Sequence, residues 1–418
     1  MHVHLLTLGS RGDVQPYVAL GATLLARGHK VTVTTGRGFD ELIEDSGLVS
    51  APISMDVRSM LGEPVVREAL DSLSGKVRAF RAMKAETLRQ IDETCDRIVE
   101  TDADVLVFHQ KMGVAPTVAA KLGVPAVASF LLPGMVATSA FPFPLIPAAS
   151  LGAIGNRLSH RLIGSLIDLS YTPLLRRWHR HRYGDTDGLL QPFDGYDPAG
   201  RPPLRLHAFS RHIVPRPEDW DRRDKVTGYW FEAAKASWAS PAGLERFLGS
   251  GPPPVYVGFG SMPSADSSRL TGIVVEALQR AGMRGLLATN WGSLESTSTP
   301  DTVHIIETAP HSWLFPRCAA VVHHGGAGTT HEGLRWGRPT VVCPVGVDQP
   351  FWGRRVAKLG VGPQPIPLKK LTPDSLAVAL RQTKDRKMDE RAARLGEEIR
   401  TEGGTEVAAD LVEAWIAR

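Results

Sequence analysis

Short apolar segments alternate with longer amphipathic segments along this chain, and the alternation runs through the sequence twice. The apolar segments have the length and composition of strands, and the segments between them have the apolar spacing of helices. Such alternation is typical of a parallel sheet covered by helices. In the first half we expect strands at Val3–Leu8, Val31–Thr35, Val105–Phe108 and Val124–Phe130, and helices at Val14–Arg27 and Lys76–Glu100.

A proline-rich stretch separates the two halves. Residues Trp238–Pro254 carry a short helical piece and end in three consecutive prolines, a composition typical of a linker. The predicted organisation is a first domain at 1–235, a linker at 236–254, a second domain at 255–400 and a last helix within 401–418. In the second domain we expect strands at Val255–Phe259, Arg284–Ala288, Thr302–Ile306, Ala319–Val322 and Thr340–Cys343, and a helix at Asp266–Ala281.

Composition excludes several classes of protein. A net charge of +4 over 418 residues is too small to predict nucleic-acid binding. The three cysteines lie far apart without zinc or disulfide spacing, and no secretory signal opens the sequence, so we expect a cytoplasmic protein. The uncharged stretch Leu122–Asn156 contains five prolines, which predicts a buried strand and an apolar loop rather than a membrane span.

The loop after the strand Ala319–Val322 carries the strongest chemical signal. Residues His323–Glu332 are rich in glycine and open a helix, so backbone N–H groups and the helix dipole can hold an anion there. We expect His324 and Thr329 to donate to phosphate oxygens and Glu332, one turn into the helix, to bind ribose hydroxyls. The alternative is an ordinary turn with a capping threonine.

Further polar groups follow the neighbouring strands of the second domain. Asp348 and Gln349 suit sugar hydroxyls, although Asp348 alone fits a helix N-cap equally well. Ser261 follows a glycine-containing strand end and can donate to a phosphate. His311 opens another short helix, where a base can rest. Because ligands of parallel sheets bind at the carboxyl ends of strands, these loops predict one binding edge.

In the first domain, the loop Gly9–Asp13 follows the first strand. A carboxylate at this edge can act as general base toward a hydroxyl group, and helix capping is the alternative role for Asp13. His109 follows the strand Val105–Phe108, where it can orient Asp13 or contact an acceptor. A partly buried histidine bonded to backbone is the alternative for His109.

Several ordered blocks of the sequence resemble one family. The second-domain pattern His324-x-Gly326-x-x-Thr329-x-x-Glu332, followed by Pro339 and by Asp348-Gln349, resembles the donor-binding pattern of the family 1 glycosyltransferases, the UDP-glycosyltransferase superfamily. Five blocks resemble the branch that contains sterol glucosyltransferases and glycopeptide-antibiotic glycosyltransferases. These blocks are Gly9–Pro16, Val226–Phe231, His323–Thr330, Asp348–Gly353 and Phe141–Pro144.

The resemblance implies a GT-B fold, in which two Rossmann-like domains face each other across a cleft and the last helix crosses back onto the first domain. It implies that Asp13, assisted by His109, takes the proton of the acceptor. The implied donor-binding residues are Ser261, His311, His324, Gly326, Ala327, Gly328, Thr329, Glu332, Asp348 and Gln349. The implied acceptor-binding residues are Arg11, Phe130, Met135, Phe141 and Phe143.

The expected activity is therefore an inverting, metal-independent transfer of glucose from UDP-glucose to a hydroxyl of a lipophilic molecule, such as a sterol, triterpenoid, polyketide or phenolic compound. The acidic pairs Asp102/Asp104 and Asp185/Asp187 lie at the wrong places for a metal site at the binding edge. The alternatives are a dTDP-deoxysugar transferase that tailors an antibiotic, a GT-B epimerase or phosphorylase, and a binding module without catalysis.

A basic run gives one further expectation. Residues Arg176–Arg182 combine concentrated positive charge with a tryptophan, which favours a solvated helix end and, as the alternative, peripheral contact with anionic membrane lipid. We expect a monomer or a homodimer.

Overall fold

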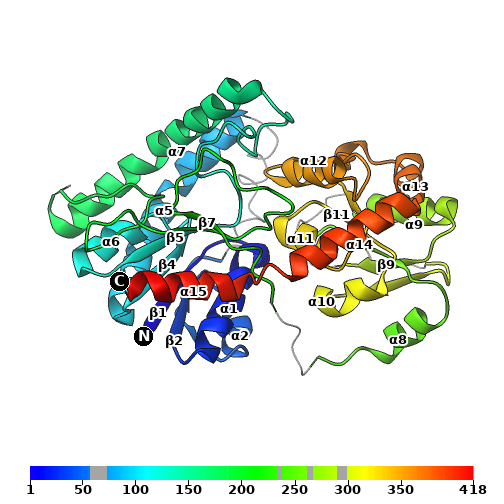
Figure 1. Cartoon of the computed structure of the whole chain (residues 1–418), viewed down its shortest axis with the longest axis horizontal. Coiled ribbons are helices and arrows are strands. Elements are labelled where there is room, and N and C mark those ends of the chain that lie inside the picture. Colours follow the sequence, from blue (N-terminus) through cyan, green and yellow to red (C-terminus); the bar gives the residue numbers. More distant parts are fainter. Residues whose placement is uncertain (57–72, 186, 233–237, 261–266, 290–298, 418) are drawn as a thin grey trace.

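Two parallel sheets, each flanked by helices, form the protein, as the alternation of segments predicts (Figure 1). This computed structural model describes residues 1–417 apart from 57–72, 186, 233–237, 261–266 and 290–298. Within the described residues the first sheet has the order β3-β2-β1-β4-β5-β6-β7 and the second has the order β10-β9-β8-β11-β12. The predicted α/β class with two doubly wound domains is confirmed.

The first domain spans the elements from β1 to β7. Its strands are β1 (His2–Leu6), β2 (Lys30–Thr34), β3 (Val49–Ser50), β4 (Val105–His109), β5 (Ala126–Phe130), β6 (Arg205–His207) and β7 (Asp224–Val226). Its helices are α1 (Arg11–Ala26), α2 (Asp40–Glu44), α5 (Leu73–Thr101), α6 (Ala115–Leu122) and α7 (Gly152–Tyr183).

The second domain follows from α8 onward. Its strands are β8 (Val255–Gly258), β9 (Gly285–Ala288), β10 (Val303–Ile306), β11 (Ala320–His323) and β12 (Thr340–Val342). Its helices are α8 (Ala242–Gly249), α9 (Ser267–Ala281), α10 (His311–Leu314), α11 (Ala327–Arg335), α12 (Gln349–Leu359), α13 (Pro373–Gln382) and α14 (Arg386–Arg400).

Strand order fixes where a ligand can bind in each domain. In the first sheet β1 pairs in parallel with β2 on one side and with β4 on the other, so the order reverses between β1 and β4. In the second sheet β8 holds the same place between β9 and β11. Crevices at the carboxyl ends of such strand pairs are the usual binding sites of open parallel sheets.

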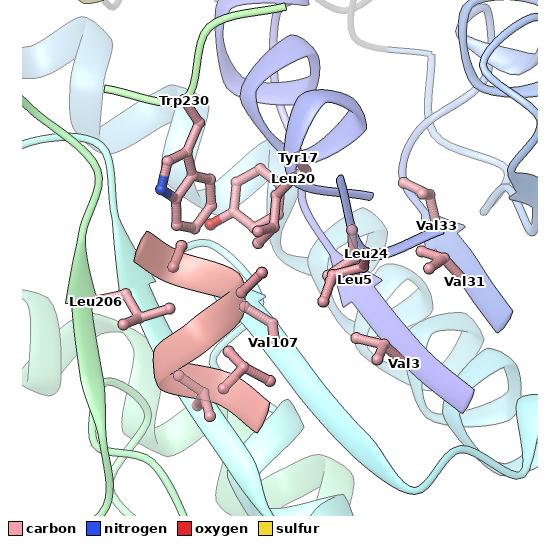
Figure 2. Close-up of a cluster of buried hydrophobic side chains, with 14 of the residues drawn as sticks. Val3, Leu5, Tyr17, Leu20, Leu24, Val31, Val33, Val107, Leu206 and Trp230 are labelled. Atoms are coloured by element: carbon pink, nitrogen blue, oxygen red, sulfur yellow. The ribbon is translucent and has the colours of Figure 1, made fainter. Parts of the chain in front are cut away.

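The last helix, α15 (Thr405–Ile416), packs on the first domain although α14 belongs to the second (Figure 1). Its buried residues Ala408, Val412 and Trp415 join the core that contains β1, β2 and α1. In Figure 2 this helix lies against the cluster around Tyr17 and Trp230, whose rings meet edge to face at 5.4 Å. The chain therefore crosses between the domains a second time near residue 402.

Direct contacts join the two domains. The Arg354 guanidinium of α12 donates to the backbone carbonyl of Ile146 at 3.0 Å, and that of Arg355 donates to the carbonyl of Ile213. The rings of Phe141 and Phe351 pack at 5.7 Å between them. α12 thus holds the second domain against the loops that follow β5 and β6.

The structure corrects the expected elements at two places and confirms a third. α1 begins at Arg11, so Asp13 belongs to the first turn of a helix rather than to a loop. The short helical piece expected within the linker forms α8, and its buried Leu244 and Phe247 pack in the core of the second domain. β6 and β7 complete the first sheet although the sequence pattern did not predict them, because three residues are too few to show a period.

No helix in the described part of the chain is both long and apolar enough to cross a membrane. The uncharged stretch 122–156 instead supplies β5, an irregular loop and the first turn of α7.

Candidate active site

Asp13 lies at the carboxyl end of β1, in the first turn of α1. Its Oδ2 atom accepts hydrogen bonds from the backbone N–H of Ser10 at 2.8 Å and from the Ser10 hydroxyl at 3.1 Å, which forms a capping box. Gly9 has a φ of +144°, and a Cβ there would lie 2.1 Å from Asp13 Oδ2. Helix capping therefore fixes one oxygen of the carboxylate and leaves Oδ1 for other partners.

The partners of Asp13 Oδ1 come from the end of β4. The Lys111 ammonium lies 2.9 Å from this oxygen, and Nε2 of the buried His109 lies 3.8 Å from it. The backbone N–H of Lys111 approaches His109 Nδ1 at 3.4 Å, so the ring proton belongs on Nε2, on the side of Asp13. His109 and Asp13 thus lie together, and Lys111 is a third member that the sequence argument did not include.

Asp13 and His109 differ in charge near neutral pH. Burial and, to a smaller extent, the charge of Lys111 lower the pKa of His109 to about 3, so the ring is neutral near pH 7. Burial would raise the pKa of Asp13, but the Lys111 ammonium and His109 outweigh it, and the pKa of Asp13 falls below its ordinary value. Asp13 is therefore a carboxylate at neutral pH, the form that a base needs.

The glycine-rich loop of the second domain follows β11. Gly326 is the N-cap of α11, and Ala327, Gly328 and Thr329 form its first turn, where backbone N–H groups have no acceptor within the helix. A Cβ on Gly326 would lie 2.7 Å from Nε2 of His324, so glycine gives this imidazole its space. A helix start of this kind can hold an anion, and anion binding here stays a prediction.

His324 is aimed into this region without a partner among the described residues. Its Nδ1 atom is buried and has no hydrogen bond from any of them. Burial lowers the pKa of His324 to about 4, so the ring is neutral near pH 7 and carries one N–H donor. An unpaired buried polar atom is costly, and a ligand oxygen accepting from this ring would remove that cost.

The Glu332 carboxylate is already engaged within α11. Its Oε1 atom accepts from the indole N–H of Trp336 at 2.7 Å, and the Arg335 guanidinium approaches Oε2 at 3.6 Å. Burial raises the pKa of Glu332 above its ordinary value. Oε2 is therefore the oxygen that remains for a ribose hydroxyl.

Asp348 and Gln349 lie at the start of α12, after β12. Asp348 occupies the N-cap position but makes no capping bond; its Oδ2 atom accepts from the indole N–H of Trp352 at 2.8 Å. Gln349 Oε1 accepts from the backbone N–H of Val345 at 2.7 Å. The N-cap alternative for Asp348 thus describes its place in the helix but not the bonding of its side chain.

Electrostatics show that the two domains face one another here. Burial raises the pKa of Asp348, and the negative charge of Asp13 raises it further while Lys111 lowers it. Burial lowers the pKa of His311 to about 4, with the charge of Arg11 acting in the same direction. Charged groups of the two domains therefore lie close enough to shift one another's pKa.

His311 and Ser261 complete the predicted donor set. His311 begins α10, its Nε2 atom lies 3.1 Å from the Tyr256 hydroxyl, and its ring stacks on Phe315 at 4.3 Å. That stacked ring can form one wall for a base. Ser261 lies outside the described residues.

A contact between the domains beside the glycine-rich loop was missing from the sequence argument. The ring of Tyr229 stacks on His331 at 4.5 Å, and the backbone N–H of Ser210 donates to His331 Nε2 at 3.2 Å. The Tyr229 hydroxyl would lie 2.9 Å from a Cβ on Gly328. The block Val226–Phe231 carries a family resemblance, and the fold shows that its Tyr229 reaches the start of α11.

The five predicted acceptor residues do not form one surface. Met135 and Phe143 line a cavity of about 230 Å³ under α7, together with His160 and Phe193. Phe130 is buried in the core with its ring 5.3 Å from that of His207, and Phe141 packs against Phe351 of the other domain. Neither ring is available to an acceptor in this arrangement, because aromatic side chains in the apolar loop after β5 also build the core and the domain contact. Arg11 is exposed in the first turn of α1, with Nε 3.4 Å from Gln15 Oε1.

One member of each acidic pair, Asp102/Asp104 and Asp185/Asp187, contacts another residue of the protein. Asp104 accepts from the backbone N–H of His2 at 2.7 Å, and Asp185 lies against His179. Within the described residues, no three histidine, cysteine, aspartate or glutamate side chains gather as a metal site would require.

Two family models match the chain. Residues 3–142 match the glycosyltransferase family 28 N-terminal domain, and residues 287–414 match the erythromycin biosynthesis protein CIII-like C-terminal domain. The first match covers β1 to β5 with Asp13 and His109, and the second covers the donor loops.

Named relatives extend the similarity over nearly the whole chain. The chain is 34% identical to sterol 3-beta-glucosyltransferase UGT80A2 of Arabidopsis thaliana over 97% of its own length and 64% of that protein. It is 35% identical to O-mycaminosyltylonolide 6-deoxyallosyltransferase of Streptomyces fradiae, over 99% of this chain and 97% of that one. The solved structure of the glycotransferase of kitacinnamycin has the same fold, with a TM-score of 0.72, 20% identity and coverage of 99% and 98%.

Proposed function

Because the chain belongs to the GT-B glycosyltransferase family that includes sterol 3-beta-glucosyltransferases and antibiotic glycosyltransferases, we propose that it transfers glucose from UDP-glucose to a hydroxyl of a lipophilic small molecule. One observation carries this proposal. Asp13, whose pKa lies below its ordinary value, belongs to the first domain; the start of α11 and His324, whose buried Nδ1 atom has no partner among the described residues, belong to the second, and the charge of Asp13 acts on Asp348 of that domain. The transfer needs a group that takes the proton of the acceptor and a group that holds the diphosphate of the nucleotide sugar.

In the proposed reaction the first domain acts on the acceptor and the second domain binds the nucleotide sugar. Asp13 Oδ1 accepts the proton of the acceptor hydroxyl as its oxygen attacks the anomeric carbon, while Oδ2 stays bound to Ser10. The nucleoside diphosphate leaves with its negative charge held by His324 and the N–H groups that open α11. Attack from the opposite face turns an α-linked donor into a β-linked product.

The other candidate residues are proposed to bind the two substrates or to orient Asp13. Glu332 Oε2 binds ribose hydroxyls, and Asp348 and Gln349 bind sugar hydroxyls. His109, as a neutral ring with Nε2–H toward Asp13, orients the carboxylate. The enzyme needs no metal and works in the cytoplasm as a monomer or homodimer; the free, buried Cys95, Cys318 and Cys343 support a reducing compartment.

A second candidate differs only in the donor. The Streptomyces fradiae relative, by its name a 6-deoxyallosyltransferase, matches this chain along nearly the full length of both. Transfer of a deoxysugar from a dTDP-sugar is therefore the alternative, and binding experiments separate the two donors.

Calorimetric titration with UDP-glucose in the presence of EDTA tests the donor and the metal together. We expect saturable binding that weakens in Glu332→Ala and His324→Ala, because each variant removes one proposed contact with the nucleotide. Binding of a dTDP-sugar in place of UDP-glucose would select the second candidate. Loss of binding in EDTA that Mg²⁺ restores would contradict metal independence.

Lys111→Met is expected to move the acidic limb of the kcat/KM profile to higher pH. Burial raises the pKa of Asp13, and Lys111 is the largest influence that lowers it, so the pKa rises when the ammonium is removed. A base works only when deprotonated, and activity is then lost earlier as the pH falls. Lys121→Met, which removes a cation beside the Tyr183 ring, is the control and should leave the limb in place. An unchanged limb in Lys111→Met would contradict the role of Asp13 as base.

A further inference from the structure

The outer face of α7 exposes a continuous row of large apolar side chains. Ile154 is 86% exposed, Leu169 is 75% exposed, and Leu158 and Leu162 are each 60% exposed. Seven of the fifteen exposed large apolar residues in the described part of the chain lie between 145 and 169, while the others are scattered. The seven are Leu145, Leu151, Ile154, Leu158, Leu162, Leu166 and Leu169.

The row follows one side of the helix. Its members from Leu151 to Leu169 are three or four residues apart, the spacing that places side chains on one helical face. At a rise of 1.5 Å per residue this row is about 27 Å long. Figure 1 shows α7 along the outer edge of the first domain. Monomeric proteins rarely leave so continuous an apolar row in water.

Positive charge accompanies the row. Arg157 and Arg161 are exposed within it, and Arg176, Arg177 and Arg180 are exposed on the continuation of the helix. Asp168 is the one acidic residue of α7. The basic run is less free than the sequence indicates, because Arg182 pairs with Asp92 and Asp96, and Trp178 and His179 are buried.

The apolar row and the positive charge beside it together indicate which partner α7 contacts. We propose that the row Leu151–Leu169 of α7 lies in the surface of an anionic membrane, with its leucines among the acyl chains and its arginines at the lipid headgroups. An amphipathic helix with an apolar face and basic flanks has this chemistry. A second copy of the chain would bring its own arginines against these ones, so charge complementarity favours anionic lipid over self-association.

The opposite side of the same helix lines the cavity under α7. The two ring nitrogens of His160 lie 3.0 and 3.1 Å from the backbone carbonyl oxygens of Gly134 and Phe141, and His160 lines the cavity with Gly164 and Ile167. The membrane would therefore lie one helix away from the apolar loop after β5. Delivery of a lipophilic acceptor by this route rests on the proposed function, whereas the membrane contact itself does not.

Flotation of the whole protein with lipid vesicles tests the contact. We expect the protein to float with vesicles of phosphatidylcholine and phosphatidylglycerol and to remain unbound with phosphatidylcholine alone. The triple variant Ile154→Ser/Leu158→Ser/Leu162→Ser should lose binding at least about tenfold, because these side chains supply apolar area to the membrane. Val378→Ser, at an apolar position on α13 that is 48% exposed, is the control and should bind like the unaltered protein.

Separate measurements keep the result interpretable. Thermal unfolding and UDP-glucose titration of the triple variant should match the unaltered protein, because the row faces solvent and no donor-binding residue lies on α7. No flotation of the unaltered protein, or equal flotation of the triple variant, would overturn the proposal. A dimer in sedimentation equilibrium that the triple variant abolishes would overturn it in favour of a second copy. A dTDP-sugar preference would change the proposed donor and leave the membrane result standing.

Discussion

Asp13→Asn is expected to lower kcat by about 10²- to 10⁴-fold, the usual range for loss of a general base. The asparagine keeps an oxygen that can accept from Ser10, so the capping box of α1 survives. It removes the negative charge that the Lys111 ammonium meets at 2.9 Å and the site that takes the proton. Initial rates with UDP-glucose and a lipophilic alcohol acceptor measure the loss.

Two controls separate catalysis from folding. Asp385 is the N-cap of α14, where its carboxylate accepts from the Lys387 backbone N–H, and Asp385→Asn should leave kcat unchanged. UDP-glucose affinity of Asp13→Asn should stay within a few-fold of the unaltered protein, because Asp13 lies in the first domain, which acts on the acceptor. Turnover close to normal would remove Asp13 from the mechanism and leave it as a helix cap.

The fold was predictable because its signals are local. Each strand predicted in the first half overlaps an observed one, since buried parallel strands are short apolar runs. The boundaries were less accurate: α1 begins at Arg11 because the Ser10 capping box starts it, and the sequence alone left Asp13 in a loop. β6 and β7 escaped prediction because strands of three residues are too short to show a period.

Residues of the candidate site could be predicted only where their place in the sequence, next to the end of a strand, fixes where they lie in the fold. Asp13, His109 and His324 each follow a strand, and the topology brings such residues to one edge. Lys111 lies two residues beyond His109, and that position at the end of β4 was the signal available for it. The stacking of Tyr229 on His331 joins residues about a hundred positions apart, so no local pattern reveals it.

Apolar residues gave the weakest site predictions, for a physical reason. A phenylalanine in a loop has the same pattern whether it faces a ligand or fills a core. Phe130 and Phe141 are packed, whereas Met135 and Phe143 reach the cavity. The exposure of side chains also changes the interpretation of α7. Its leucines have the pattern of core residues in the sequence, but they face solvent in the structure.

His324→Ala is expected to lower kcat by about 10²- to 10³-fold, the cost of removing one donor from a site of developing negative charge. The ring lies between the glycine of the N-cap and the end of β11, and its buried Nδ1 atom has no partner among the described residues. The diphosphate gains negative charge as the bond to the sugar breaks, so a hydrogen bond there strengthens in the transition state. Single-turnover rates at saturating UDP-glucose isolate this step from binding.

The protonation state of His324 makes the prediction sharper. Burial lowers the pKa of His324 to about 4, so the free enzyme offers a neutral N–H donor. His324→Gln, which keeps a neutral N–H donor, should then recover part of the rate lost in His324→Ala. His304→Gln, on β10 where the ring stacks on Phe247, is the control and should leave the rate unchanged. If His324→Gln is as slow as His324→Ala at saturating UDP-glucose, a neutral N–H donor does not replace the ring, and the role of His324 as a neutral donor is wrong.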